Sequence, residues 1–233
     1  MEQSGWLNVN KPVNYTSTKV VAIIKRITKA KKVGHGGTLD PLASGVLPIC
    51  INKATKQVES MMNHSKTYLF HLTFGELRDT GDAEGVILEK NDFVPTVDDI
   101  KNVLPSFVGT IKQTPPVYSA IKVEGKRACD LVRDGKKVEL EARDIVINDL
   151  QFNGFVEDKT AEFVVDCGRG CYVRSLGVDI AKSLGAVAYV SKIIRSRVGN
   201  FRIENAINIE DLNNDAYEVL LNNLITVWVT YHQ

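Results

Sequence analysis

Residues 66–75, "KTYLFHLTFG", constrain the fold more than any other stretch, because apolar and polar side chains alternate along them. Alternation with a period of two residues is typical of a β-strand with one buried face. Two further runs, "ARDIVINDLQFNGF" and "TAEFVVD", follow each other between residues 142 and 166. Consecutive strands joined by a short turn pair antiparallel. The sequence therefore predicts a hairpin there and a mostly antiparallel sheet.

Helices and shorter strands are predicted around this sheet. Thr16 or Ser17 is expected to cap a helix whose apolar residues recur at helical spacing, namely Val20, Ile23, Ile24 and Ile27. Further helices are expected over residues 96–104, 125–135 and 176–185, and further strands over 5–10 and 115–123. Hairpins combined with returning helices favour an α+β fold, a mixed and mostly antiparallel sheet flanked by helices, over a doubly wound one.

The composition limits the size and the compartment of the protein. With 233 residues, 44% of them hydrophobic, the chain can bury the core of one large domain or of two small ones. No run of about eighteen apolar residues and no signal-peptide pattern is present, so we expect a cytoplasmic protein without a membrane segment. The cysteines are expected to be thiols, and the spacing in "CGRGC" does not suit a zinc site, so no metal is expected.

Positive charge is concentrated in two windows although the net charge is only +1. No acidic residue occurs from Gln3 to Leu39, where the cations are Lys11, Lys19, Lys25, Arg26, Lys29, Lys31 and Lys32. Residues 167–202 hold one acid and the cations Arg169, Arg174, Lys182, Lys192, Arg195, Arg197 and Arg202. One such cluster is ordinarily a solvated helix face. Two clusters in a nearly neutral chain favour a surface that binds a polyanion, because Lys and Arg displace counterions from phosphates.

Asp40 stands at the end of the glycine-rich string "GHGGTLDP". Glycines allow the backbone to approach a ligand closely, and Pro41 biases Asp40 toward an extended conformation. The carboxylate is therefore expected to project from the end of a loop. An ordinary Asp-Pro turn is the alternative interpretation of "LDP" by itself.

The wider sequence resembles the TruB family of tRNA pseudouridine synthases. The motifs that carry the resemblance run in family order from Gly5 to about Leu212: "NKP", "GHGGTLDPLASGVLP", "KTYLF", "GELRDTGDAEG", "PPVYSAIKVEGKR", "GCYVRSL" and "RSRVGNF". The resemblance implies a pseudouridine synthase fold with a central catalytic cleft. It also implies conversion of uridine to pseudouridine in the T-loop of tRNA, at tRNA position 55, with no cofactor or metal.

Three residues match the catalytic positions of that family. Asp40 matches its aspartate, which acts either as a nucleophile on the sugar or as a base at C2′, and both routes stay open. Arg174 matches the arginine that pairs with this aspartate, and Tyr68 matches the tyrosine that stacks on the flipped base. From the residues alone, Arg174 could instead contact phosphate or lie on the surface, and Tyr68 could be a core-facing aromatic.

Further residues are expected to contact or support the RNA. His35 resembles the histidine that helps to displace or hold the flipped nucleotide, Lys11 would support the pocket or a phosphate, and Tyr118 and Lys122 would shape the pocket floor. Phosphate contacts are expected from Lys25, Arg26, Lys29, Lys31, Lys32 and Arg195. The partner implied is the T-arm stem-loop of tRNA, bound by a monomer that requires no protein partner.

Some positions depart from the family pattern, and two other functions remain open. Gly36 and Arg78 replace usual threonines, and Ile194 replaces a common arginine. These departures affect the expected strength of the RNA contacts and leave the assignment of Asp40 unchanged. The alternatives are an RNA chaperone that helps tRNA fold with little catalysis, and an Asp-nucleophile hydrolase or phosphotransferase, for which no acidic metal-binding cluster is found near Asp40. We expect a catalytic domain over residues 1–212 and a short tail over 213–233, without Lys or Arg, in place of a PUA-like domain.

Overall fold

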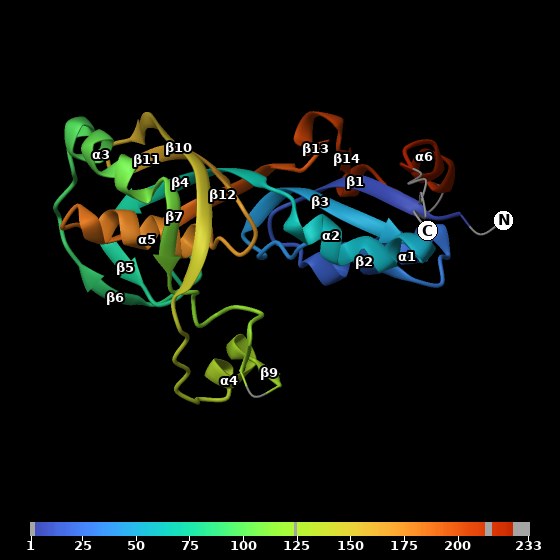
Figure 1. Ribbon diagram of the computed structural model, residues 1–233, viewed down its shortest axis with the longest axis horizontal. Coiled ribbons are helices and arrows are strands. Elements are labelled where there is room, and N and C mark those ends of the chain that lie inside the picture. The colour runs from blue at the N-terminus through green and yellow to red at the C-terminus, as the bar shows by residue number, and fades with distance from the viewer. Residues whose placement is uncertain (1–2, 124, 213–215, 226–233) are drawn as a thin grey trace. The chain divides into compact units, whose positions relative to one another are not determined.

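The computed structural model describes residues 3–123, 125–212 and 216–225 (Figure 1). Its contacts divide the chain into two compact units, one of residues 1–67 with 194–233 and one of residues 68–193. We call them unit 1 and unit 2. The boundary that the sequence suggested after residue 212 stays a prediction. Of the expected tail, residues 213–215 and 226–233 lie outside the described part.

Unit 1 contains the N-terminal strands and the first helix. Its strand order is β14-β1-β3-β12, with β2 paired to β3 and β13 paired to β12. The strands are β1 (Gly5–Lys11), β2 (Val33–His35), β3 (Ala43–Ile51), β13 (Phe201–Arg202), β14 (Ile207–Asn208) and the last residues of β12 (Ala188–Val198). β1 and β2 pair antiparallel with β3, and β14 pairs parallel with β1. The predicted strand over residues 5–10 is confirmed.

Helix α1 (Ser17–Thr28) forms as the sequence predicted. The Thr16 side chain accepts a hydrogen bond from the amide of Lys19, so Thr16 is the N-cap of the two candidates. Val20, Ile24 and Ile27 are buried, whereas the lysines and the arginine of the helix point outward. The other helical segments of this unit are η1 (Asn52–Gln57), α2 (Val58–Asn63), η3 (Ile203–Asn205), η4 (Ile209–Asp211) and α6 (Tyr217–Asn222).

The core of unit 1 forms where β1, β3 and β12 carry apolar residues toward α2. It contains Trp6, Val46, Cys50, Ala54, Val198 and Phe201, with Met61 packed against it. The described part of the C-terminal tail also contacts this unit. Ile225 exchanges backbone hydrogen bonds with Trp6, at 2.9 and 2.8 Å.

Unit 2 is built on the strands that the alternating segments predicted. The strand order is β12-β4-β11-β10-β7, formed by β4 (Lys66–Phe74), β7 (Gly109–Gln113), β10 (Arg143–Glu157), β11 (Thr160–Cys167) and the first residues of β12. β10 pairs antiparallel with both β7 and β11. Phe70 of β4 stacks on Phe163 of β11, with ring centroids 5.2 Å apart. The mixed, mostly antiparallel α+β fold is thus confirmed.

Helix α5 (Val173–Ser183) packs closely on the sheet of unit 2. Gly177 makes this approach possible, because a Cβ atom there would lie 2.7 Å from Val190 and 3.0 Å from Leu72. Helix α3 (Val97–Val103) begins with a reciprocal capping box between Thr96 and Asp99. The remaining elements are β5 (Glu76–Arg78), β6 (Ile87–Lys90), η2 (Leu104–Phe107), β8 (Lys122–Val123), β9 (Lys126–Arg127) and α4 (Ala128–Arg133).

The strand predicted over residues 115–123 is wrong for most of its length. Pro115 and Pro116 have no amide hydrogen to donate, and strand structure is confined to Lys122–Val123. The carbonyls of Ser119 and Ile121 accept hydrogen bonds from the start of α4 and not from a neighbouring strand. Figure 1 shows β9 and α4 as a lobe that extends from the ends of β7 and β10. The predicted helix over 125–135 is correspondingly shortened to α4.

Candidate active site

The loop that carries Asp40 spans residues 36–42, between β2 and β3, and its backbone is hydrogen-bonded on both sides of the aspartate. The Ser17 hydroxyl binds the amide of Leu39 at 2.9 Å and its carbonyl at 3.1 Å. Asn14 donates to the carbonyl of Pro41 at 2.8 Å, and Ala43 donates to the carbonyl of Asp40 at 3.1 Å. These hydrogen bonds hold the backbone of the loop in one conformation. A reacting carboxylate needs preorganisation of this kind.

Lys11 anchors this loop from the end of β1. Its side chain is fully buried, and Nζ donates to the carbonyls of Pro12, Tyr15 and Pro41 at 2.9, 2.6 and 3.4 Å. Burial lowers the pKa of Lys11 to about 8, with the Asp40 carboxylate acting in the opposite direction. Of the two roles expected for Lys11, support of the pocket agrees with this position better than contact with a phosphate.

Arg195, on β12, anchors the loop from the opposite side. The side chain is 1% exposed. Its Nε donates to the carbonyl of Val46 at 2.8 Å, and its terminal nitrogens donate to Gly37 and Thr38 at 3.0 and 3.3 Å. The sequence suggested a phosphate contact for this arginine. The structure instead directs its guanidinium into the protein, toward the loop.

His35 lies half-buried at the start of the same loop. The amide of Gly37 donates to its Nδ1 at 3.4 Å. Burial, and then the positive charge of Arg195, lower the pKa of His35. The imidazole is therefore neutral at pH 7 and can accept or donate a hydrogen bond.

Gly36 follows His35 and has a steric reason to be a glycine in this chain. A Cβ atom at this position would collide with the side chain of Met61 and lie 3.3 Å from the ring of Trp6. The departure from the family's threonine is thus accompanied by a methionine that fills the space.

Arg174 forms the centre of the polar network in unit 2. It is buried on α5, and its terminal nitrogens donate to the carbonyls of Thr80 and Tyr118 at 2.9 and 3.0 Å. Its Nε lies 3.6 Å from a carboxylate oxygen of Asp82. The surface position that remained open for Arg174 is excluded by this burial. The pairing of Arg174 with Asp40 stays a prediction.

Asp82 is the residue that sequence reasoning missed. It stands in the turn-like string "DTGDAEG", yet it is 5% exposed and its Oδ1 accepts hydrogen bonds from the Thr80 hydroxyl and the Glu84 amide. An acidic residue directly after a glycine, as Asp82 is after Gly81, is also the pattern of a solvated turn. No pattern within the turn distinguishes the two, because the cation beside Asp82 is Arg174, which lies far away in the sequence.

The remaining predicted pocket residues of unit 2 differ in their surroundings. Tyr68 is 8% exposed and shares the buried face of β4 with Phe70, which agrees with a core-facing aromatic as well as with a wall of a pocket. The Tyr118 hydroxyl donates to Asp79 at 3.4 Å, and burial followed by the Asp79 charge raises the pKa of Tyr118. Lys122 is exposed on β8.

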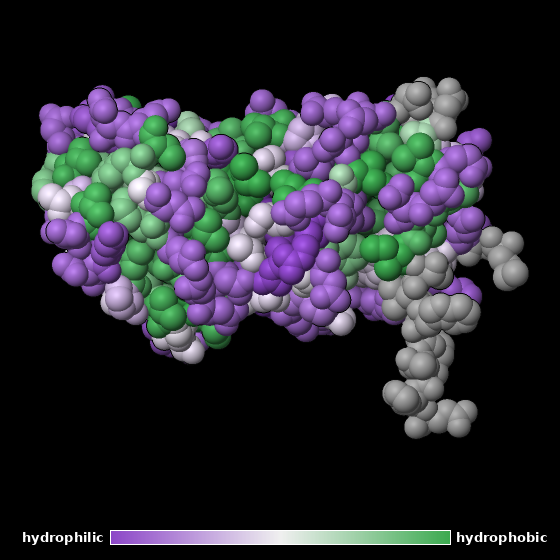
Figure 2. Space-filling view, turned by 90° about the horizontal axis from the view of Figure 1, so that it is seen from above, coloured by the Kyte–Doolittle hydropathy of each residue, from purple (hydrophilic) through white to green (hydrophobic). Residues whose placement is uncertain are grey.

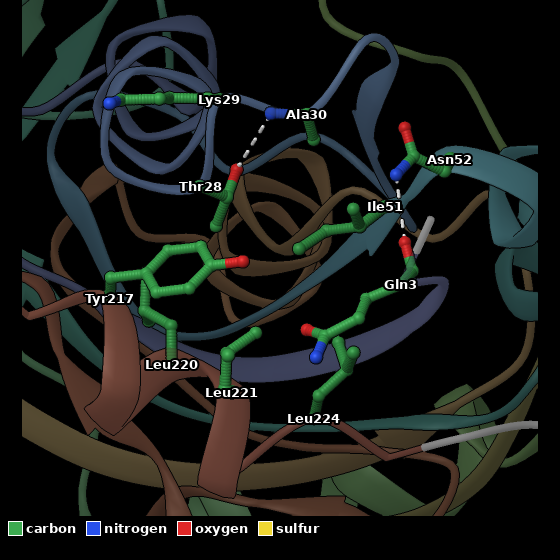
Figure 3. Close-up of a pocket in the computed structure, with 10 residues that line it drawn as sticks. All are labelled: Gln3, Thr28, Lys29, Ala30, Ile51, Asn52, Tyr217, Leu220, Leu221 and Leu224. Carbon is green, nitrogen blue, oxygen red and sulfur yellow. Dashed lines mark hydrogen bonds between the residues drawn. The ribbon is translucent and has the colours of Figure 1, made fainter. Parts of the chain in front are cut away.

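Two cavities among the described residues differ in the side chains that line them: charged residues are prominent in one, and leucines in the other. One of about 280 Å³ in unit 2 is lined partly by Asp79, Thr80, Arg174 and Asp179. Another of about 210 Å³ lies in unit 1 between the end of α1, the end of β3 and α6. Figure 3 shows its Tyr217 and leucine side chains opposite Ile51, with Thr28 and Asn52 already hydrogen-bonded to Ala30 and Gln3. None of its lining residues belongs to the Asp40 loop.

The predicted phosphate-binding residues of the first window lie on the surface. Lys25, Arg26, Lys29, Lys31 and Lys32 are all exposed on α1 or directly after it. On the face drawn in Figure 2, hydrophilic and hydrophobic side chains are interspersed. Within the described residues, no group of three or more acidic, His or Cys side chains is placed to hold a metal ion. The described helices are all too short or too polar to cross a bilayer.

Comparison with known proteins places this arrangement in a family. The family model for the TruB family pseudouridylate synthase (N terminal domain) matches residues 25–173, which include the Asp40 loop and most of unit 2. The chain belongs to the TruB family. The tRNA pseudouridine synthase B of Ehrlichia canis is 47% identical over 209 residues, which are 89% of this chain and 69% of the relative. That of Rickettsia bellii is 43% identical over 211 residues, 90% of this chain and 72% of the relative.

Solved structures support the same assignment for this TruB-family chain. A chain in a crystal structure of a Cbf5-Nop10-Gar1 complex is 32% identical with a TM-score of 0.71, and the match covers 91% of the present chain. A chain in an H/ACA RNP bound to a substrate RNA containing 2′-deoxyuridine is 29% identical with a TM-score of 0.67 and 94% coverage. The present chain spans about half of those chains, 54% and 55% respectively.

Proposed function

We propose that this TruB-family enzyme isomerises uridine to pseudouridine in tRNA, at position 55 of the T-loop, with Asp40 as the catalytic carboxylate. The observation that carries the proposal is the Asp40 loop, in which the peptide groups on both sides of the aspartate are held by Lys11, Ser17 and Arg195. Buried donors that fix a backbone around a single acidic side chain support a site for chemistry over a solvated turn.

The reaction requires one carboxylate and no cofactor. The C1′–N1 bond of uridine breaks, the uracil rotates, and C5 bonds to C1′, after which C5 loses its proton and N1 gains one. Asp40 acts on the sugar, either by attack on C1′ or by removal of the C2′ proton. The uracil stays in the pocket between cleavage of the C1′–N1 bond and formation of the C1′–C5 bond, and Tyr68 offers it a π-face for stacking worth about 1–3 kcal/mol. Arg174 balances the charge of Asp40, and His35 holds the displaced nucleotide.

The tRNA is bound mainly through its phosphates. The exposed cations of α1 and of the segment after it provide such contacts, and Tyr118 and Lys122 shape the pocket floor in unit 2. The names of the relatives, tRNA pseudouridine synthase B, support tRNA as the substrate. The H/ACA RNP structure, which contains a related chain, is bound to a substrate RNA. The enzyme acts as a monomer in the cytoplasm and requires neither a protein partner nor a metal.

A comparison of Asp40→Asn with the wild type tests this function. An unmodified tRNA transcript carrying tritium at C5 of its uridines releases tritium when C5 bonds to C1′. We expect the wild type to release it and Asp40→Asn to release none, while both bind the transcript with similar Kd. The exposed Asp98→Asn on α3 is the matched control and retains activity.

Two outcomes would contradict the proposal. Tritium release by Asp40→Asn would show that another group carries the reaction. Binding without any release by the wild type would favour the alternative function, an RNA chaperone that assists tRNA folding.

A further inference from the structure

Arg195 makes a set of contacts that no phosphate-binding role explains. Arg195 is 1% exposed, and its guanidinium donates to three backbone carbonyls. A buried cation is costly unless its donors are satisfied, and the planar fork of arginine can satisfy several carbonyls at once. The buried charge of Arg195 therefore serves to hold the backbone that carries these carbonyls.

The three carbonyls lie on both sides of Asp40 in the sequence. Gly37 and Thr38 precede the aspartate, and Val46 follows it on β3. One rigid side chain thus joins the start of the loop to the strand that continues from its end. Lys11 and Ser17 hold the segment between these two points, at Leu39 and Pro41.

The backbone of Arg195 is itself closely packed against that strand. Gly45 has φ of +106°, and a Cβ atom there would collide with the carbonyl oxygen of Arg195 and lie 2.8 Å from its nitrogen. Only glycine adopts this conformation readily and allows so close an approach. Because the backbone of Arg195 has little freedom relative to β3, its guanidinium sets the position of Gly37 and Thr38.

Arg197 provides an internal comparison on the same strand. It donates to the side chains of Ser65 and Thr67 and to the carbonyl of Gly199. Arg195 thus donates to the Asp40 loop, whereas these partners of Arg197 lie at the start of β4 and after β12.

We infer that Arg195 is a positioning residue for catalysis, which fixes the Asp40 loop and so sets the rate of the chemical step without contacting the RNA. The inference rests on the proposed role of Asp40. A displacement of about 1 Å in a reacting group can lower a rate by about a hundredfold. Loss of the guanidinium is therefore expected to reduce turnover and to leave tRNA affinity unchanged.

Single-turnover kinetics separate these two effects. Arg195→Gln is expected to lower the rate at saturating enzyme by about tenfold to a hundredfold, with Kd for the tRNA transcript within about twofold of wild type and the same salt dependence. Arg195→Lys keeps a buried cation that can donate to carbonyls, and should recover part of the lost rate. Arg197→Gln is the matched control and should retain the wild-type rate.

Amide hydrogen exchange measures the loop itself and does not depend on activity. Exchange within residues 36–43 should be faster in Arg195→Gln than in the wild type and unchanged in Arg197→Gln. If Arg195→Gln does not fold, the Lys variant is compared by the same two measurements, and it should show both a reduced rate and faster exchange in this segment.

Three results would overturn the inference. One is a raised Kd with a flatter salt dependence and an unchanged single-turnover rate, which would make Arg195 an RNA contact. Another is a reduced rate with unaltered exchange in the loop. The third is an equal loss of rate in Arg197→Gln. Failure of the proposed function is recognised separately, because Asp40→Asn would then release tritium while the exchange result for Arg195 stood.

Discussion

Nε of Arg174 lies 3.6 Å from Oδ2 of Asp82, and both side chains are buried, with 5% and 7% of their surfaces exposed. Asp82 is held in turn by the Thr80 hydroxyl and the Glu84 amide. Since Arg174 also donates to the carbonyls of Thr80 and Tyr118, it connects the 79–85 turn to the segment before the α4 lobe. The orientation of this arginine is therefore determined largely within unit 2.

Replacement of Asp82 should destabilise the protein more than replacement of a surface acid. Asp82→Asn removes the carboxylate that lies beside the buried Arg174 guanidinium, and breaking a buried pair in this way costs about 3–5 kcal/mol. The control is Asp92→Asn, which breaks the exposed ion pair with Lys159 and should cost at most about 1 kcal/mol. Urea unfolding of both variants gives the two free energies. Equal values would show that the Arg174 site tolerates a neutral partner.

Threonine at position 36 should be tolerated only when Met61 is shortened. Gly36→Thr places a Cβ atom against the Met61 side chain, and overpacking of this kind costs about 1–3 kcal/mol. In the Met61→Ala background the same substitution should cost clearly less. A double-mutant cycle of unfolding free energies measures this coupling. Additive costs would mean that the loop, and not Met61, moves to accommodate the threonine.

Lys11 should give the stability of the enzyme a measurable pH dependence. Its pKa is lowered from 10.5 to about 8 in the folded protein, so between these values the unfolded chain binds more protons. The contribution of Lys11 to the free energy of unfolding therefore rises with pH across this window, at up to about 1.4 kcal/mol per pH unit. Lys11→Met should lack this rise. Wild type and variant with parallel stability profiles from pH 8 to 10.5 would disprove the assignment.

The affinity for tRNA should fall steeply with salt. Each phosphate contact contributes about −0.7 to −0.9 to the slope of log K against log salt, because its counterions are released on binding. Alanine variants of Lys25, Arg26, Lys29, Lys31 and Lys32 should each flatten the slope by up to about 1. Lys101→Ala on α3, an exposed lysine in unit 2, is the control and should not change it. A wild-type slope near zero would mean that this surface is only solvated.

Local patterns in the sequence predicted most of the elements. The alternation in residues 66–75 became β4, the runs between 142 and 166 became β10 and β11, and the threonine at position 16 capped α1. Each depends on interactions between residues a few positions apart, such as the contact of a cap with the amide three residues later. The strand prediction for residues 115–123 failed because two carbonyls of this segment accept hydrogen bonds from the start of α4. No pattern within the segment encodes these partners.

By itself, the sequence determined which residue types flank Asp40 in the chain and where most of the strands and helices lie. Only the tertiary structure decided which charges are buried. Arg195 looked like its neighbours in a basic window, yet β12 places it against Gly37, which is 158 positions away in the chain. Asp82 looked like part of a turn until Arg174 was found beside it. Burial of a charge depends on distant partners that replace its water, and a sequence pattern is limited to near neighbours.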